Sequence, residues 1–471
     1  MSLRLQDLPT DVLLRIFAFI EPLDVLRLRQ TSKFLNAFNS ERTLWTSLYR
    51  SSSLFLPSID LPNHIRPTLE RLLVRAQHLD VSWSNQSFKL VRQRRLACSI
   101  TKEGVRGIEL YSGRYLFLAS KTRFALFDLD GGGDWDRPMF TMQAQGQGQG
   151  QGEEYFSATN HRRCSGNGYG SGEIFIPMLR TSKSTDSLAL VIWHLRPSHS
   201  PPLTQITSFA IQSGSIPPTL WSADGYLVYH SEPHTTPIPN VFVYDFERRK
   251  HHRLDMDSEP RMQTQRRVYH HEYIPTKGFI LAMHISASET VFEVFTTRTE
   301  GETLRRTHVG LCPKGLTEPA IISIVSTHEE ETTLHLAAIF HFGGLLAFRV
   351  HLKPDGTITF SFAPSPGNGT VDLSPPSSAY SLAIAGDHRG RARAASLMAT
   401  SSVSLLLHEI EFGEDSEGKE GKQDTTTRID VKQTAITVPE LAYGNDYAWD
   451  AFRGRLCTQP EDASVMVMDY V

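Results

Sequence analysis

The chain has 471 residues, of which 40% are hydrophobic and 21% are charged, and its formal net charge is −3. This length is too great for one ordinary core, and the composition excludes an intrinsically disordered chain, so we expect at least two folded units. The nearly neutral charge gives no overall field that would favour nucleic acid or an anionic membrane as a partner.

The N-terminal 50 residues predict a series of short helices. Apolar residues at positions 8, 12, 13, 16, 17 and 20 follow the three-four spacing of one helix face. Pro9 and Asp11 suit the first turn of that helix. So small a unit cannot bury all of its apolar surface alone. That surface therefore meets either a partner or the next segment of the chain, and the periodicity favours neither.

Residues 51–97 are expected to form a helical linker, with an amphipathic helix from about Leu69 to Leu79. Basic residues outnumber acidic ones between Arg66 and Arg106. We interpret this stretch as a solvated face. Arg92, Arg94 and Arg95 form a small basic cluster that could read a phosphate group.

After residue 98 the hydrophobic pattern changes to period two, which is typical of β-strands. Apolar strands recur in seven units, and the second strand of each unit begins near residue 124, 188, 241, 291, 345, 403 or 465. Such regular spacing predicts a repeated four-stranded blade and therefore a β-propeller over residues 98–471. Seven blades are favoured, with six or eight as alternatives, and pairing of early with late strands would close the ring. Asp128, Asp245 and Asp469 end three of the second strands.

Two polar segments interrupt this β-rich body. Residues 141–153 include a Gln-Gly repeat, and residues 413–427 form a mixed-charge run. Neither buries enough apolar surface to order itself, so we expect disordered surface loops. The most apolar stretch, residues 334–350, is broken by Gly343-Gly344. It is too short for a membrane helix and predicts two strands joined by a tight turn.

Residues 5–49 contain six short motifs in this order: Leu8-Pro9-x-Asp11-Val12, Ile16-Phe17, Pro22-Leu23-Asp24-Val25-Leu26, Thr31-Ser32-Lys33-Phe34, Leu44-Trp45 and Leu48-Tyr49. In their order and spacing these motifs resemble the F-box family. Ser32 stands where many members carry Cys. The resemblance covers about a tenth of the chain and implies an F-box at residues 1–50.

In that family the module docks on a Skp-family adaptor, which is tied to cullin and RING subunits. The resemblance implies that eight apolar residues form or support the adaptor contact: Leu8, Pro9, Val12, Leu13, Ile16, Phe17, Leu23 and Leu26. It also implies that the C-terminal domain captures a protein substrate whose identity is unknown. Phe34, Leu35, Phe38, Leu44, Trp45 and Leu48 are expected to form the core of the module.

The chain offers few residues in patterns typical of catalysis. The four cysteines are far apart and form no CxxC pair, which predicts neither a zinc site nor a disulfide framework. His251-His252 and His270-His271 are the densest histidine groups, and neighbouring strand residues point to opposite faces. We expect surface or strand-edge histidines, and we expect no metal and no cofactor.

The sequence therefore predicts an α+β multidomain protein, with a helical F-box module followed by an all-β propeller. The expected function is a non-catalytic, substrate-recognition adaptor of an SCF-type E3 ubiquitin ligase, acting in ubiquitin-dependent protein degradation. A propeller enzyme, either a hydrolase or a lyase, is one alternative, and an F-box scaffold without ligase activity is another. The reducing-type cysteine usage and the lack of an apolar signal-peptide core favour the cytoplasm or the nucleus. No nucleic-acid or membrane partner is expected.

Overall fold

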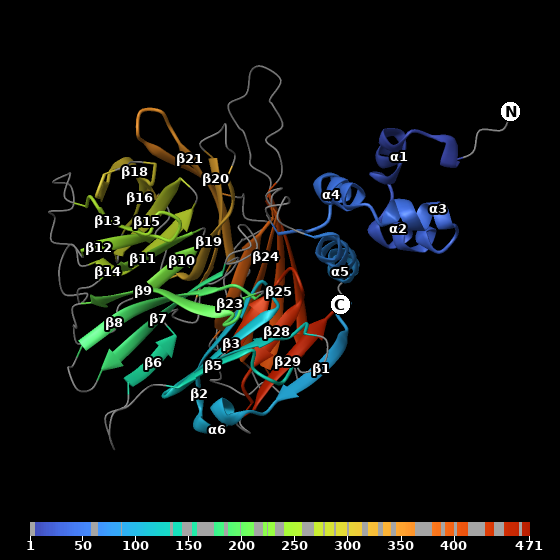
Figure 1. Ribbon diagram of the computed structural model, residues 1–471. Helices are drawn as coiled ribbons and strands as arrows, with labels where there is room; N and C mark the ends of the chain where they lie inside the picture. Colours follow the sequence, from blue (N-terminus) through green and yellow to red (C-terminus); the bar gives the residue numbers. More distant parts are fainter. Residues whose placement is uncertain are drawn as a thin grey trace, which may run out of the picture.

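The structure is a computed structural model of the 471-residue chain (Figure 1). It describes residues 5–57, 65–85, 87–131, 135–143, 153–157, 174–182, 187–197, 199–211, 220–223, 225–230, 240–256, 268–276, 278–286, 289–298, 301–312, 319–327, 333–340, 345–362, 379–387, 391–399, 403–412, 429–437, 447–460 and 464–471.

The N-terminal part of the chain is helical, as its apolar spacing predicts (Figure 1). Its elements are η1 (Leu5–Asp7), α1 (Thr10–Phe17), α2 (Pro22–Arg29), α3 (Lys33–Asn39), α4 (Arg42–Ser51) and α5 (Arg66–Ser84). Pro9 immediately precedes α1, and Pro22 begins α2, where a missing N–H costs no helical hydrogen bond. The Ser32 side chain accepts a hydrogen bond from the Leu35 N–H and caps α3.

The rest of the described chain is built from strands and one short helix, α6 (Ser99–Glu103). The strands are β1 (Leu90–Leu96), β2 (Val105–Tyr111), β3 (Tyr115–Ser120), β4 (Arg123–Asp128), β5 (Phe140–Gln143), β6 (Glu153–Ser157), β7 (Ile174–Ser182), β8 (Ser187–Leu195), β9 (Leu203–Ile211), β10 (Leu220–Ala223), β11 (Tyr226–His230), β12 (Val241–Asp245), β13 (Lys250–Leu254), β14 (Val268–Thr276), β15 (Phe279–Ser286), β16 (Thr290–Thr296), β17 (Thr303–Leu304), β18 (Arg306–Cys312), β19 (Pro319–Thr327), β20 (Thr333–Phe340), β21 (Leu345–Leu352), β22 (Ile358–Phe362), β23 (Ala379–Gly386), β24 (Arg391–Ala399), β25 (Val403–Phe412), β26 (Ile429–Thr437), β27 (Tyr447–Asp450), β28 (Arg455–Thr458) and β29 (Val465–Tyr470).

These strands form the seven blades of a β-propeller, which confirms the favoured blade number. In chain order the blades are β2-β3-β4-β5, β6-β7-β8-β9, β10-β11-β12-β13-β17, β14-β15-β16-β18, β19-β20-β21-β22, β23-β24-β25-β26 and β27-β28-β29-β1. Neighbouring strands within a blade are antiparallel, except that β17 runs parallel to β13. Blade 7 joins the last three strands of the chain to β1, so early and late strands close the ring together.

The seven strands that set the predicted period are the third strands of their blades. They begin at residues 123, 187, 241, 290, 345, 403 and 465. Third strands are covered on both sides by adjacent blades, and all six side chains of β29 are buried. Outer strands are more polar, as the exposed residues of β1 illustrate. The apolar pattern therefore marks the middle of each blade and leaves its edges unmarked.

The helical linker expected at residues 51–97 is only partly helical. Helix α5 lies within it, but Leu90–Leu96 form strand β1 of blade 7. The basic residues of β1 do not alternate with apolar ones, so the local sequence does not predict a strand here. The segment forms a strand because it pairs with the distant strand β29. The Gln-Gly repeat, the mixed-charge run and the Gly343-Gly344 turn lie outside the described residues. At the two ends of the expected loop 141–153, residues 141–143 belong to β5 and residue 153 begins β6. The two strands on either side of that turn, β20 and β21, are paired as expected.

Candidate partner-binding site

Helices α1 to α4 pack together around a set of buried apolar side chains. Leu13, Phe17, Val25 and Trp45 are each at most 2% exposed. The Phe17 ring meets the Phe38 ring edge to face, with 5.0 Å between the ring centroids. Leu35, Leu44 and Leu48 are also buried, as expected for core residues, but the expectation was wrong for Phe34, which is 36% exposed. The module is therefore packed internally and does not depend on a partner for these contacts.

Asn39 fixes the mutual positions of three of these helices. It is fully buried at the end of α3, and its Nδ2 donates a hydrogen bond to the Val25 carbonyl oxygen of α2 at 2.8 Å. Its own carbonyl oxygen accepts a hydrogen bond from Trp45 Nε1 of α4 at 2.7 Å. Because buried polar groups must be satisfied in this way, these bonds select one arrangement of α2, α3 and α4.

A row of apolar side chains remains exposed on this packed module. Val12 and Ile16 lie one turn apart on α1 and are 37% and 39% exposed. Phe19 follows in the turn after α1 and is 91% exposed. Leu5 and Phe34 add 44% and 36% exposed side chains to the same module. Exposed apolar side chains gathered on so small a unit are typical of an interaction surface.

The structure divides the residues that the resemblance assigned to the adaptor contact. Pro9, Val12 and Ile16 are exposed, Leu8, Leu23 and Leu26 are partly buried, and Leu13 and Phe17 belong to the core. The last two can support the contact but cannot make it. Phe19 was not predicted, although its spacing of seven from Val12 and three from Ile16 continues the pattern of that helix face just beyond the end of α1.

Helix α5 and the segment after α4 seat this module on blades 6 and 7. Arg393 of β24 is 1% exposed and forms ion pairs with Asp80 of α5 at 2.6 Å and Glu409 of β25 at 3.0 Å. Its guanidinium carbon lies 4.5 Å from the Phe55 ring centroid and 4.7 Å from that of Trp83. One cation therefore joins helix, linker and propeller through charge and ring contacts.

A second contact joins α5 to the C-terminal strand. Arg75 donates hydrogen bonds to the carbonyl oxygens of Arg453 and Tyr470, with Nη2 2.6 and 2.9 Å from these oxygens. Figure 1 shows the C-terminus beside α5. Gly454 lets the helix approach closely, because a Cβ there would lie 2.7 Å from Leu79 Cδ2.

The helices occupy one face of the propeller. They contact the β27–β28 turn at Gly454, and Phe55 lies against Arg391 at the start of β24. Connections between successive antiparallel strands alternate between the two faces. The β1–β2 connection with α6, and the β3–β4 turn, therefore lie on the opposite face, and Figure 1 shows α6 far from α1–α4. That opposite face is not covered by the F-box helices.

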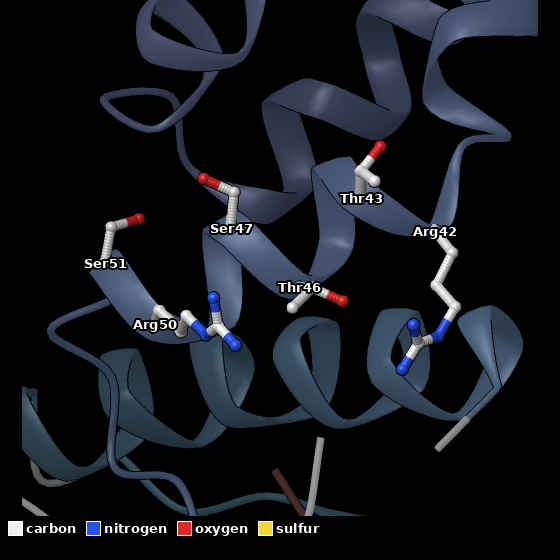
Figure 2. Close-up of a pocket in the computed structure, with 6 residues that line it drawn as sticks. All are labelled: Arg42, Thr43, Thr46, Ser47, Arg50 and Ser51. Carbon is white, nitrogen blue, oxygen red and sulfur yellow. The ribbon is translucent and has the colours of Figure 1, made fainter. Parts of the chain in front are cut away.

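A polar groove runs along α4 (Figure 2). It is lined by Arg42, Thr43, Thr46, Ser47, Arg50 and Ser51. Figure 2 shows the two guanidinium groups and Thr46 on the side of α4 next to α5. These six residues offer hydrogen-bond donors but no carboxylate or imidazole to act as a general base.

His251 and His252 lie on opposite faces of β13, as expected, but His252 is buried, which corrects the expectation that both are surface or strand-edge residues. His251 is exposed, whereas His252 is 5% exposed and its Nδ1 lies 2.9 Å from the Gly301 carbonyl oxygen. The side chain of His270 is outside the described residues. His271 Nδ1 lies 2.8 Å from Nδ1 of His284.

A buried polar chain in blade 4 continues from His284. Its Nε2 lies 3.1 Å from Glu293 Oε2, and Arg306 donates to Glu293 Oε1 at 2.6 Å. Burial acts to raise the pKa of Glu293, but the hydrogen bonds from His284 and Arg306 hold that pKa below its ordinary value. Within the described part of the chain, no group of three or more His, Cys, Asp or Glu side chains could hold a metal ion.

The three arginines of the predicted basic cluster, Arg92, Arg94 and Arg95, also differ in burial. Arg94 is 7% exposed, donates to the Leu129 carbonyl oxygen at 2.6 Å and pairs with Asp469 at 3.3 Å. It therefore stabilises the junction of blades 7 and 1 and is not available to read a phosphate group. Arg92 and Arg95 are exposed on β1. Among the described helices, none is both long and apolar enough to cross a membrane.

Comparison with known proteins identifies the helical module. The F-box-like family model matches residues 5–51. No curated protein matches the chain.

Three solved structures illustrate distant likenesses to this chain. Drosophila Plexin A in complex with Semaphorin 1b has 9% identity and a TM-score of 0.40, covering 81% of this chain and 87% of that chain. Drosophila Semaphorin 1a, extracellular domains 1-2, has 8% identity and a TM-score of 0.42, covering 81% and 88%. A hypothetical selenium-binding protein from Sulfolobus tokodaii has 11% identity and a TM-score of 0.36, covering 73% and 80%. Likenesses of this size carry no argument about function. The chain thus carries an F-box at residues 5–51, followed by a seven-bladed β-propeller.

Proposed function

We propose that this chain is the substrate-recognition adaptor of an SCF-type E3 ubiquitin ligase. The F-box binds a Skp-family adaptor, which connects it to the cullin and RING subunits, and the propeller binds a target protein. An F-box joined to a propeller fits a substrate adaptor in general. The observation that carries the proposal is the exposed row of Val12, Ile16 and Phe19 on a module whose own core is already filled.

The exposed row of Val12, Ile16 and Phe19 can anchor a partner protein by burying apolar surface. Fully burying a large apolar side chain contributes about 1.5–3 kcal/mol, and association then costs several kcal/mol. Phe19 has the most surface left to bury, because it is 91% exposed. Aromatic anchors of this kind dominate the energetics of many interfaces. Phe19, Ile16 and Val12 together can therefore support a stable complex without any ion pair.

The placement of the F-box also supports the proposal. The helices cover the propeller face that carries the β27–β28 turn and leave the opposite face for a target. A target bound there is held at a high effective concentration beside the catalytic subunits of the ligase. Members of the F-box family are generally non-catalytic adaptors, and we propose the same for this chain. We place it in the cytoplasm or the nucleus.

A pull-down of the full chain with a purified Skp-family adaptor tests the proposal. The double variant Ile16→Asp/Phe19→Asp should lose binding, because each carboxylate would have to be desolvated in the apolar contact. Both positions are exposed, so the fold should survive, and circular dichroism and thermal melting verify this.

Leu311→Asp is the matched control, because Leu311 is 55% exposed on blade 4 and remote from the F-box. It should bind the adaptor as the unmodified chain does. Absence of binding by the folded, unmodified chain would refute the adaptor role. If Leu311→Asp lost as much adaptor binding as the double variant, an added carboxylate at any exposed position would weaken binding. The row of Val12, Ile16 and Phe19 would then not be the adaptor contact.

A further inference from the structure

The turn between β12 and β13 presents three consecutive cations to solvent. Residues 246–249 form this turn, and Lys250 begins β13. Arg248, Arg249 and Lys250 are all exposed. The turn lies on the face that carries the β27–β28 turn, because the third strand of each blade ends on that face. Blade 3 lies across the ring from blades 6 and 7, so the F-box helices leave the turn uncovered.

Three contacts fix the backbone of this turn to the propeller. Phe246 is 4% exposed, and its ring stacks on the Phe175 ring of blade 2 with 4.4 Å between the ring centroids. The Phe246 N–H donates a hydrogen bond to the Gly225 carbonyl oxygen at 2.9 Å. The Arg248 N–H donates a hydrogen bond to Asp245 Oδ1, also at 2.9 Å. The cations therefore stand on a fixed backbone, which lowers the entropy lost when a partner binds.

Arg249 has a strained backbone conformation. Its φ is +55°, in the left-handed region that a residue with a Cβ enters only at a cost. The turn between the third and fourth strands of blade 5 places a glycine, Gly356, in this region with a φ of +82°. Within the described residues, the Arg249 side chain has no hydrogen-bond or ion-pair partner. The guanidinium group thus does not offset the strain inside the fold, which points to a contact outside the molecule.

The charges around the turn leave an excess of positive charge on its solvent side. Asp245 is buried beneath Arg248, with 3.8 Å between Oδ2 and Nε, but the Arg248 side chain is still 48% exposed. Glu247 is exposed beside the three cations. In the described part of the chain, Lys250 has no side-chain hydrogen bond or ion pair. Such a surface attracts an anionic partner.

The chemistry of the turn favours clustered carboxylates over a nucleic acid. Arginine binds a carboxylate with two parallel hydrogen bonds, and lysine adds a point charge beside it. Proteins that bind a phosphate backbone commonly contact about six to ten phosphates, and this turn has too few cations for that. The edge of β13 is paired with β17, so a partner binds here through side chains and not as an added strand.

We propose that the β12–β13 turn is a docking site for an acidic segment of a partner protein. Carboxylates of that segment bind Arg249 and Lys250, and Arg248 adds charge beside them. Exposed ion pairs are individually weak, so this site speeds encounter and adds affinity to a contact made elsewhere. The proposal is independent of what the F-box binds.

Fluorescence anisotropy with the full chain at low ionic strength tests this site. The probe is a labelled, capped hexaglutamate peptide, which should bind and should be released as salt is added. Arg249→Gln/Lys250→Gln should weaken binding about fivefold, because two exposed ion pairs are lost. The matched control is Arg15→Gln/Arg50→Gln, which removes two exposed cations from the F-box helices and should leave binding unchanged.

Arg249→Gly separates the cation from the backbone strain. It should weaken peptide binding about twofold and should not lower the urea midpoint of unfolding, because glycine adopts this φ without strain. A lowered midpoint would show that the Arg249 side chain serves the fold, which would overturn the proposal.

Four other results would also overturn it. They are no binding of hexaglutamate at low salt, unchanged binding by Arg249→Gln/Lys250→Gln, an equal loss in the control, and equal binding of a single-stranded RNA of the same net charge.

Discussion

Arg393 holds a positive charge inside the interface between the F-box linker and the propeller. Its side chain is 1% exposed, whereas those of its partners Asp80 and Glu409 are 26% and 16% exposed. A buried cation of this kind is retained only if its partners satisfy it. No sequence pattern could identify its role, because Asp80 and Arg393 are 313 residues apart.

Replacing Arg393 with Met should destabilise the protein by about 3 kcal/mol, because two carboxylates lose their shared counter-charge. The urea midpoint of unfolding measures this loss. The matched control is Arg27→Met, which removes an exposed pair with Asp24 and should cost less than about 1 kcal/mol. Adding Asp80→Asn and Glu409→Gln to Arg393→Met should recover part of the loss. Similar midpoints for the two single variants would contradict the role of Arg393.

Glu109 is a second buried ionisable group, with a different consequence. It is 5% exposed on β2, accepts a hydrogen bond from the Tyr111 hydroxyl group, and burial raises its pKa to about 8. The folded protein therefore binds this proton more tightly than the unfolded chain does. Its contribution to stability is full below about pH 4.5 and is lost as the pH rises through about 8.

Glu109→Gln should remove this pH dependence. The unmodified chain should lose several kcal/mol of stability relative to the variant between pH 4.5 and 8, at about 1.4 kcal/mol for each unit of pKa shift. Urea unfolding of both proteins across this pH range measures the difference between their free energies of unfolding. The contributions of the other titrating groups cancel in this difference, because both proteins contain them. A constant difference across the range would show that Glu109 titrates as an exposed carboxylate does.

At the scale of elements, helix α5 approaches the β27–β28 turn so closely that only glycine fits. Gly454 has a φ of +57°, and a Cβ there would lie 2.7 Å from Leu79 Cδ2 and 2.8 Å from the Tyr470 carbonyl oxygen. The β27–β28 turn, helix α5 and strand β29 therefore meet at Gly454. This contact sets the distance between the F-box and blade 7.

Gly454→Ala should destabilise the protein by about 3 kcal/mol, because it adds both a strained backbone and a steric clash. The control is Gly104→Ala, where φ is +87° but no atom lies within 4 Å of the added Cβ. That change should cost about 1 kcal/mol through the backbone alone. Thermal unfolding of both variants gives the comparison, and equal losses would mean that α5 moves away without cost.

The elements also differ in how far the sequence predicted them. The third strand of each blade is apolar because both of its faces are covered, so its spacing revealed the repeat. Strand β1 has a polar sequence and becomes a strand by pairing with β29, more than 360 residues later. In α1 the spacing predicted the helix, but Phe19 lies just beyond its end and was missed.

At the scale of the whole molecule, the F-box and the propeller share one core. Side chains from α1 to α5 are contiguous with Leu405, Leu456, Met466 and Met468 of blades 6 and 7. Separate domains joined by a flexible linker would each have their own core. The orientation of the F-box relative to the propeller is therefore fixed by packing.

This shared core predicts a single unfolding unit. In native-state hydrogen exchange, the central amides of α5 and β29 should have the same opening free energy. Arg393→Met should lower both values together, because its side chain lies at the junction. Exchange of α5 at much lower free energy than β29 would show that the helices open independently of the propeller.

From the sequence alone, residues 5–49 resemble the F-box family through the order and spacing of their motifs, and local periodicity favours a seven-fold repeat whose ring closes by pairing early with late strands. It also indicated the apolar face of α1. Only the tertiary structure decided which of these residues are core and which are exposed, since that depends on what the other helices cover. It also decided that β1 completes blade 7, that Arg393 and Gly454 seat the helices, and which propeller face the F-box helices cover. Those features join residues hundreds of positions apart, and no local pattern encodes such contacts.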